Sequence, residues 1–260
     1  MRILILLFFC ISYSFSQSSP KYEVAPLEDE SHEYEITVDT RTEVDKLSDP
    51  DKIVRKNALI SIGTKRDKKY INHIVKMLND KDIEIRTIAV NLLSEMGTAQ
   101  TVGANILEVF KQDKDNTNFQ MACIIALGKL KYKPAIPYIK EKLNHIHPVV
   151  RTYAISSLGE FKDPTVYPLI KEKISDPAEG VSIEAMRVSA KCGIKTAIPI
   201  IKEKLKHPVA SVRREAVLAL GELADKTIMP DLESLLDDED KSVVDAVKKV
   251  IEKFEGKPKK

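Results

Sequence analysis

Four prolines stand at a fixed interval of 31 residues in this chain, at Pro137, Pro168, Pro199 and Pro230. Each lies near the start of an apolar and charged stretch with helical spacing, of which "TAIPIIKEKL" around Pro199 is one example. A fixed period of about 20 to 50 residues is the signature of a repeat array, whose units bury their apolar faces by stacking on one another. The chain is therefore expected to grow along one direction instead of folding around a single core.

A second register supports the same period. A small apolar residue recurs in the first half of every unit, in steps of 31 residues with a single step of 34. We place the three extra residues at "GTAQTVG", residues 97–103, where two glycines are expected to loosen the turn. Seven units result, the last of them truncated. The anchor positions are Ala58, Ala89, Cys123, Ala154, Ala185, Ala216 and Val247.

Each unit has the pattern of two helices. In residues 211–238, Val212, Ala216 and Leu223 follow helical spacing, and Ile228 and Leu232 repeat it after a short turn. The sequence thus predicts an all-α fold, a right-handed α-solenoid of about seven two-helix repeats with a period of about 31 residues, over residues 47–260.

Threonines precede three of the recurring prolines. Thr165, Thr196 and Thr227 stand three residues ahead, and threonine is a good N-cap residue. The proline then falls in the first helical turn, where an N–H group has no partner within the helix. A residue before proline avoids the helical region, so the alternative is a regular helix that starts at the proline itself.

The first residues have the pattern of a signal peptide, residues 1–16. One cation, Arg2, precedes an apolar run over residues 3–11, and Ser14 and Ser16 suit cleavage before Gln17. The run is too short to span a bilayer, so no transmembrane span is expected after cleavage. We predict an exported protein, periplasmic or extracellular, from a bacterium. A lipid anchor at Cys10 is the alternative, which the bulky "LFF" before it disfavours.

Residues 17–46 form an acidic leader. Nine acidic residues against three basic ones give this segment a net charge of −6, and residues 47–260 carry +7. Such a composition is typical of a flexible spacer, and an arm folded back on the basic body is the alternative. The end of the leader, "TRTEVDKLSD", is alternatively a short capping helix that uses Val44 and Leu47.

The segments "VRREAVLALGELAD" and "VRTYAISSLGEFKD", each followed by a proline-containing helix, resemble the short HEAT repeats also found in bilin lyases, over residues 47–254. The resemblance implies a structural ladder between units, formed by an arginine of the first helix and an aspartate after the glycine. The chain departs from this pattern at Gln120, Ser182 and Val244. The expected members are Arg55, Arg86, Arg151 and Arg213 with Asp67, Asp163 and Asp225.

Catalytic chemistry finds little support. We find no nucleophile elbow, phosphate loop or dinucleotide fingerprint, and the one His-Glu pair, His32-Glu33, lies in the leader. His145, Asp176 and His207 occupy equivalent turn positions on successive units, too far apart to share one metal ion. We predict no catalytic, cofactor or metal residues. Cys123 and Cys192 are interpreted as packing residues two units apart, and His73 as a packing or surface residue.

The remaining candidate is a charged surface. A Lys-Glu-Lys triplet follows the proline at the same place in three units, and we expect it to line the concave wall of the solenoid. A solvated face whose charges neutralise one another is the alternative. We predict a non-enzymatic scaffold that binds another protein, preferably through an acidic segment, with a lyase or chaperone-like enzyme of the bilin-lyase type as the alternative. A nucleic-acid partner is not expected. The triplets are Lys140, Glu141, Lys142; Lys171, Glu172, Lys173; and Lys202, Glu203, Lys204.

Overall fold

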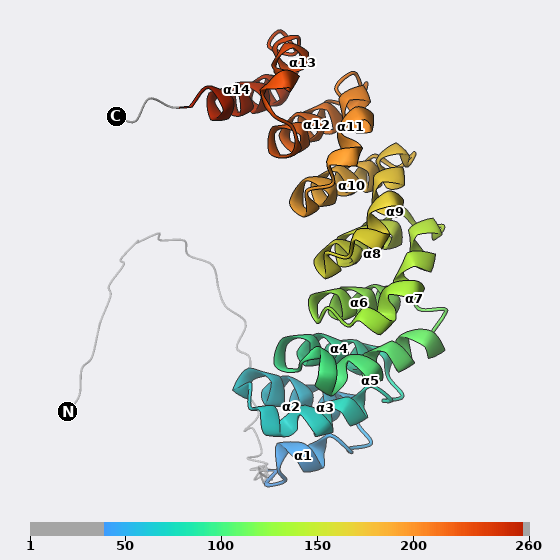
Figure 1. Cartoon of the computed structure of the whole chain (residues 1–260). Helices are drawn as coiled ribbons and strands as arrows, with labels where there is room; N and C mark the ends of the chain where they lie inside the picture. Colours follow the sequence, from blue (N-terminus) through green and yellow to red (C-terminus); the bar gives the residue numbers. More distant parts are fainter. Residues whose placement is uncertain (1–38, 257–260) are drawn as a thin grey trace, which may run out of the picture. The chain divides into compact units, whose positions relative to one another are not determined.

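The computed structural model describes residues 39–256, and all of the regular elements in that range are helical. The compact unit that contains them begins at Arg41. The predicted signal peptide and most of the predicted leader lie outside the described residues. The all-α solenoid predicted from the repeat period is confirmed, and seven first helices are present (Figure 1).

The first helices of the seven repeats are long and regular, with 13 to 15 residues each. They pack directly on one another along the array (Figure 1). Each anchor residue predicted from the sequence is at most 1% exposed, which places the small side chain where successive helices approach. The helices are α2 (Lys52–Lys65), α4 (Ile83–Met96), α6 (Thr117–Lys129), α8 (Pro148–Phe161), α10 (Glu179–Cys192), α12 (Ala210–Leu223) and α14 (Lys241–Glu255).

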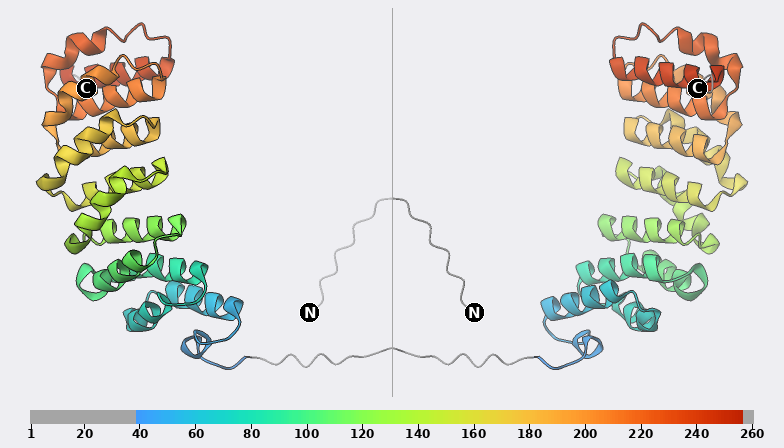
Figure 2. Two further views of the ribbon diagram at one scale, coloured as in Figure 1. Left: turned by 90° about the vertical axis from the view of Figure 1, so that its right-hand side faces the viewer. Right: turned by 90° about the vertical axis from the view of Figure 1, so that its left-hand side faces the viewer.

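The second helices form a separate row, each packed on the first helix of the following repeat (Figure 2). Most are short and follow a 3-10 turn, so a repeat turns the chain tightly before the next first helix begins. The second helices are α3 (Ile71–Met77), α5 (Ala99–Gln112), α7 (Ile136–Glu141), α9 (Tyr167–Glu172), α11 (Ile198–Lys204) and α13 (Met229–Glu233). The 3-10 turns before them are η1 (Lys68–Tyr70), η2 (Lys133–Ala135), η4 (Pro164–Val166), η6 (Lys195–Ala197) and η7 (Lys226–Ile228), and two more, η3 (Lys142–Asn144) and η5 (Lys173–Ser175), follow α7 and α9.

The recurring prolines occupy the first turn of the second helices, but the predicted threonine caps are wrong. Pro199 is the second residue of α11, and Thr196 lies inside the preceding turn η6. In the equivalent turn η4, the Asp163 carboxylate accepts a hydrogen bond from the Thr165 N–H at 2.9 Å. The chain is thus already turning before the proline. Aspartate caps the turns that contain Thr165 and Thr227, whereas the turn that contains Thr196 has no side-chain cap.

The three extra residues of the second repeat produce a long second helix, α5. Gly97 ends α4, as expected at a turn, but Gly103 lies inside α5 and is packed against the Tyr132 ring. The buried pair Ile106 and Phe110 stands 17 and 21 residues after the anchor, against 16 and 20 for the equivalent pairs in other repeats. One extra residue therefore precedes the core of this helix and two follow it, so the predicted location was only partly right.

A short helix stands before the first repeat. Helix α1 (Glu43–Lys46) begins at Thr42, whose side chain and that of Asp45 form a reciprocal capping box. Leu47 directly after it is 7% exposed and belongs to the core, while Val44 is half-buried. Helix α1 packs on α2 and covers the open side of the first repeat, as the capping-helix alternative describes.

Candidate functional site

The arginines of the first helices connect successive turns of the array. Arg151 in α8 forms a bidentate ion pair with Asp176, through Nε at 2.8 Å and Nη2 at 2.7 Å. Its third nitrogen, Nη1, donates to the carbonyl oxygen of His145 at 2.8 Å. One guanidinium therefore joins the turn before its own helix to the turn before the next first helix, with planar geometry that a lysine could not reproduce.

The arginine ladder exists, but its acidic members differ from those predicted. The expected partners Asp67, Asp163 and Asp225 cap the 3-10 turns, where each accepts a backbone N–H hydrogen bond. The arginines instead pair with an aspartate 25 or 27 residues further along the chain, at the end of their own repeat. The observed pairs are Arg55–Asp80, Arg86–Asp113, Arg151–Asp176 and Arg213–Asp238.

Two junctions have a different, uncharged composition. Where the first helix carries Gln120 or Ser182 in place of arginine, the turn that would supply the aspartate carries a histidine, His145 or His207. Buried Gln120 donates to the carbonyl oxygen of Asp113, and Ser182 to that of Ile174. An aspartate facing glutamine or serine would be a buried charge without a partner, which is costly. The repeats therefore differ in pairs of residues, not one residue at a time.

The histidines take over the turn-forming role of the aspartates. In the turn before α10, Asp176 Oδ1 accepts the N–H of the residue two positions later at 3.0 Å. His145 Nδ1 and His207 Nδ1 accept the equivalent N–H at 3.1 Å and 3.2 Å. This contact needs an unprotonated Nδ1, and burial together with the charge of Lys142 lowers the pKa of His145. The interpretation of these positions as turn residues agrees with these contacts.

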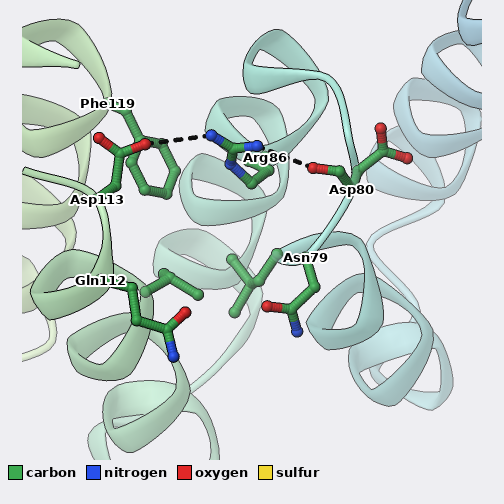
Figure 3. Close-up of a pocket in the computed structure, with 8 residues that line it drawn as sticks. Asn79, Asp80, Arg86, Gln112, Asp113 and Phe119 are labelled. Atoms are coloured by element: carbon green, nitrogen blue, oxygen red, sulfur yellow. Dashed lines mark hydrogen bonds and ion pairs between the residues drawn. The ribbon is translucent and has the colours of Figure 1, made fainter. Parts of the chain in front are cut away.

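Arg86 lines a hollow to which the first, second and third repeats all contribute residues. Figure 3 shows its guanidinium between Asp113 and the main chain of Asp80, at 3.1 Å and 3.0 Å, with the Phe119 ring beside it. The guanidinium carbon lies 5.4 Å from the ring centroid, within the range of a cation–π contact. The hollow measures about 280 Å³, but its charges are already paired. It is best explained as part of the ladder.

The Lys-Glu-Lys triplets lie on the row of second helices, which forms the outer, convex side of the curved array and not the concave wall that we predicted (Figure 1). We call this surface the Lys-Glu-Lys face. Glu141, Glu172 and Glu203 are exposed, and the lysines beside them are half-buried except for exposed Lys202. This arrangement follows from a helix that turns its isoleucines toward the core. Some of these lysines have partners on neighbouring repeats: Lys202 pairs with Asp231 at 2.8 Å, and Lys173 donates to Asn144 Oδ1 at 2.8 Å.

One part of this face is hollowed, between α5 and α7. We name it the lysine pocket; it measures about 460 Å³, and its wall holds the Phe110 and Tyr138 rings. Lys142 Nζ lies 5.5 Å from the Phe110 centroid, and Lys111 Nζ lies 5.5 Å from that of Tyr138. Burial lowers the pKa of Lys142; Lys114 acts in the same direction and Glu141 against it. The complete lining is Phe110, Lys111, Lys114, Gln120, Tyr138, Glu141 and Lys142.

The sequence analysis did not identify Lys111 and Lys114. Both follow the core of α5, the helix displaced by the three-residue insertion, so neither matches the register that marked the other lysines. Lys111 is also held by Glu108 one turn away at 3.5 Å. The signal that could have located them is the insertion itself, because extra residues in an array commonly mark a binding face.

A family model described as HEAT repeats matches residues 43–115, 103–188 and 168–252. The chain belongs to the HEAT-repeat family. This HEAT array resembles the complex of CpcE and CpcF of phycocyanin lyase from Nostoc sp. PCC7120, with 16% identity, a TM-score of 0.52, and coverage of 88% of this chain and 100% of that chain. It also resembles a crystal structure of an engineered protein, at 18% identity and a TM-score of 0.52, covering 71% and 96% of the two chains.

Identities this low show the fold alone. No curated protein matches the sequence of this HEAT array. Over residues 39–256, no helix has both the length and the apolar content that a membrane crossing requires. In the same range no group of three or more metal-binding side chains comes together.

The first helices of the HEAT array expose a second, apolar surface that the sequence analysis did not predict. Ile125 of α6 is 42% exposed, and Val149 and Tyr153 of α8 are 46% and 37% exposed. A shallow hollow of about 360 Å³ lies between these two helices. At the neighbouring junction of α8 and α10 the same face is crossed by an ion pair between Lys191 and Glu160.

The two cysteines of the described HEAT array are free thiols. Cys123 is fully buried and Cys192 is half-buried, with its Sγ 3.4 Å from the carbonyl oxygen of Gly159. Burial raises the pKa of both thiols, so neither is primed as a nucleophile. Their interpretation as packing residues agrees with these surroundings.

Proposed function

We propose that this protein is an exported, non-enzymatic scaffold whose Lys-Glu-Lys face binds an acidic segment of a partner protein. The observation that carries the proposal is the repetition of one charged triplet at the ends of three consecutive second helices, α7, α9 and α11, with Lys142 and Lys173 in the turns that follow. Solenoids commonly bind proteins along their concave surface, and here the repeated charged units lie on the outer row instead, where they still present an extended surface. A flexible acidic segment can follow such a row and contact several repeats at once.

The charges of this face favour an acidic partner. Each triplet holds two lysines for one glutamate, which leaves a net charge of +1 per repeat. Lys140 and Lys142 stand on the two flanks of Glu141, so a partner carboxylate can approach a lysine from either side of the helix. Exposed ion pairs contribute little individually. The proposal therefore requires contacts on several repeats, and binding that weakens as the salt concentration rises.

Site-specific photo-crosslinking in the native organism tests the proposal. A photo-reactive residue at Glu172, in the middle of the Lys-Glu-Lys face, should crosslink to one discrete protein. The matched control is Asn91, an exposed residue on the row of first helices. Equal yields from both positions, or a small molecule that co-purifies while no protein is captured, would contradict the scaffold.

Export is a separate part of the proposal, supported by the pattern of residues 1–16. Cell fractionation should recover the chain outside the cytoplasm with an N-terminus near Gln17, as mass spectrometry of the intact protein would show. A full-length chain in the cytoplasm would contradict export and leave the binding proposal to its own test.

A further inference from the structure

We infer that the lysine pocket between α5 and α7 is the anchor site of the Lys-Glu-Lys face, and that it takes two neighbouring carboxylates and an adjoining apolar side chain of an acidic peptide. This inference rests on the proposed function and adds a location and a ligand chemistry to it. Four observations support it: the missing arginine, the unpaired lysines, the aromatic wall and the insertion in α5.

The pocket lies at a junction that lacks the ladder. In four other repeats, an arginine three residues before the anchor extends to the following turn and binds its aspartate. In the third repeat this position is Gln120, which is shorter and donates to the carbonyl oxygen of Asp113 instead. The guanidinium and its carboxylate are both absent here, and Gln120 forms part of the pocket wall.

In the described part of the chain, two of the three lysines of the pocket lack an ion-pair partner, whereas Lys111 pairs with Glu108. Lys173, which begins η5 as Lys142 begins η3, donates to Asn144 on the preceding repeat. Lys142 instead extends over the Phe110 ring. Within residues 39–256, neither Lys142 nor Lys114 has a carboxylate at ion-pair distance. The two ammonium groups come from different repeats, and their mutual repulsion would be relieved by a pair of carboxylates bound between them.

The wall and the size of the pocket favour a peptide over a free inorganic ion. Phe110 is buried and Tyr138 is half-buried, and their rings supply an apolar surface beside the charges. A volume of about 460 Å³ lies in the range of ligand pockets and exceeds what one carboxylate fills. The remaining space fits an apolar side chain next to the acidic pair. A protein partner can supply the carboxylates and the apolar side chain on one segment of its chain.

The test is fluorescence anisotropy with a labelled peptide of sequence Gly-Leu-Glu-Glu-Leu-Gly and the full chain. We expect the double variant Lys114→Met, Lys142→Met to weaken binding at least about tenfold, since each loss removes a charge-assisted contact. The matched control is Lys65→Met, Lys248→Met, which removes the same charge from exposed positions on the row of first helices and should change the affinity less than about twofold. A Gly-Leu-Gln-Gln-Leu-Gly peptide should not bind.

A second variant closes the pocket without removing a lysine. Gln120→Arg with His145→Asp rebuilds at this junction the pair that four other junctions contain, at the same spacing of 25 residues as Arg151 and Asp176. We expect it to fold, as circular dichroism would show, and to weaken peptide binding about tenfold.

The outcomes separate the two proposals. Unchanged affinity in both pocket variants would overturn the anchor site and leave the Lys-Glu-Lys face to its own test. No binding of the acidic peptide at about 1 mM, the range of weak association, would also overturn the anchor site. The proposed function fails by a different measurement, the absence of a selective crosslink at Glu172.

Discussion

Separating Arg151 from Asp176 should cost far more stability than replacing the two residues together. The Asp176 side chain is 5% exposed and that of Arg151 is 12% exposed, so either group alone would be a nearly buried charge without its partner. Removing one partner of such a pair costs about 3 to 5 kcal/mol, and the residual exposure of Arg151 favours the lower end. We therefore expect Arg151→Gln to lose about 3 kcal/mol in the free energy of unfolding.

The chain itself supplies the compensated combination. The double variant Arg151→Gln, Asp176→His copies the Gln120 and His145 junction, with no buried charge and with an imidazole nitrogen to accept the turn N–H. Its loss should be about 1 kcal/mol, the net contribution of ordinary hydrogen bonds, so the two substitutions should couple by about 2 kcal/mol or more.

Urea unfolding followed by circular dichroism measures these free energies, with hydrogen exchange of α8 as a local readout because repeat arrays can unfold in parts. The reasoning is refuted if the loss in the double variant equals the sum of the losses in the single variants Arg151→Gln and Asp176→His.

Acid offers an independent check on the same pair. Burial alone would raise the pKa of Asp176, but hydrogen bonds from Arg151 and from the Ala178 N–H outweigh it, and the folded-state pKa lies below 3.8. A lowered carboxyl pKa contributes stability that is present above the unfolded value and is lost as the pH falls through the folded value. The wild type should therefore lose its advantage over the variant Arg151→Gln, Asp176→Asn, which has no titrating side chain at either position, below about pH 4, the unfolded aspartate value.

Three further predictions follow from single sites. Burial and nearby cations lower the pKa of His145, so its contribution to the free energy of unfolding is complete above the unfolded value of 6.5 and is lost as the pH falls below it. Urea unfolding at neutral and acidic pH should therefore show that His145→Asn loses less stability in acid than the wild type. Gly128→Ala should lose about 1 to 3 kcal/mol, because a Cβ there would meet the next first helix at 2.7 Å, whereas Gly180→Ala, with nothing within 4 Å, should lose nothing in the same assay. Asp163→Ala should lower the melting temperature through the loss of about 1 kcal/mol of capping, and Thr165→Ala should not, contrary to the threonine caps predicted from the sequence.

The repeat architecture could be predicted because it depends on periodic burial. The anchor residues had to be small wherever first helices pack on one another, and this constraint leaves a regular mark in the chain. Position 123 illustrates it, since a cysteine there occupies the same buried place as the alanines at 89 and 154. The truncated seventh repeat followed from the same register.

The ladder partners could not be located by the same reasoning. Asp163 and Asp176 both follow their first helix, and a family pattern placed the partner at the nearer one. Which aspartate is bound depends on how far the guanidinium of Arg151 extends across the turn. The repeat period of the sequence does not give this distance. The exchange of arginine for glutamine and of aspartate for histidine at one junction was visible in the sequence, but we had assigned the histidine and the aspartate only to turns.

Only part of the lysine pocket could be predicted from the sequence, for a related reason. Lys142 belongs to the regular triplets and was named, whereas Lys111 and Lys114 follow the buried end of α5, where two added residues shift the chain out of register. The position of a side chain on such an irregular helix can be located only when the packing of that helix in the fold is known.

The alternation of charged and uncharged junctions also determines how this array can change its length. Deleting the single repeat between His145 and Asp176 would bring Gln120 opposite Asp176, and a buried carboxylate would lose its counter-ion. Deleting 62 residues, from His145 to His207, would bring Gln120 opposite a histidine again. A single repeat can be lost without this penalty only if the deletion removes Arg151 and Asp176 together, as a deletion of residues 146–176 would. The unit that can be exchanged therefore runs from an arginine to the aspartate that it binds.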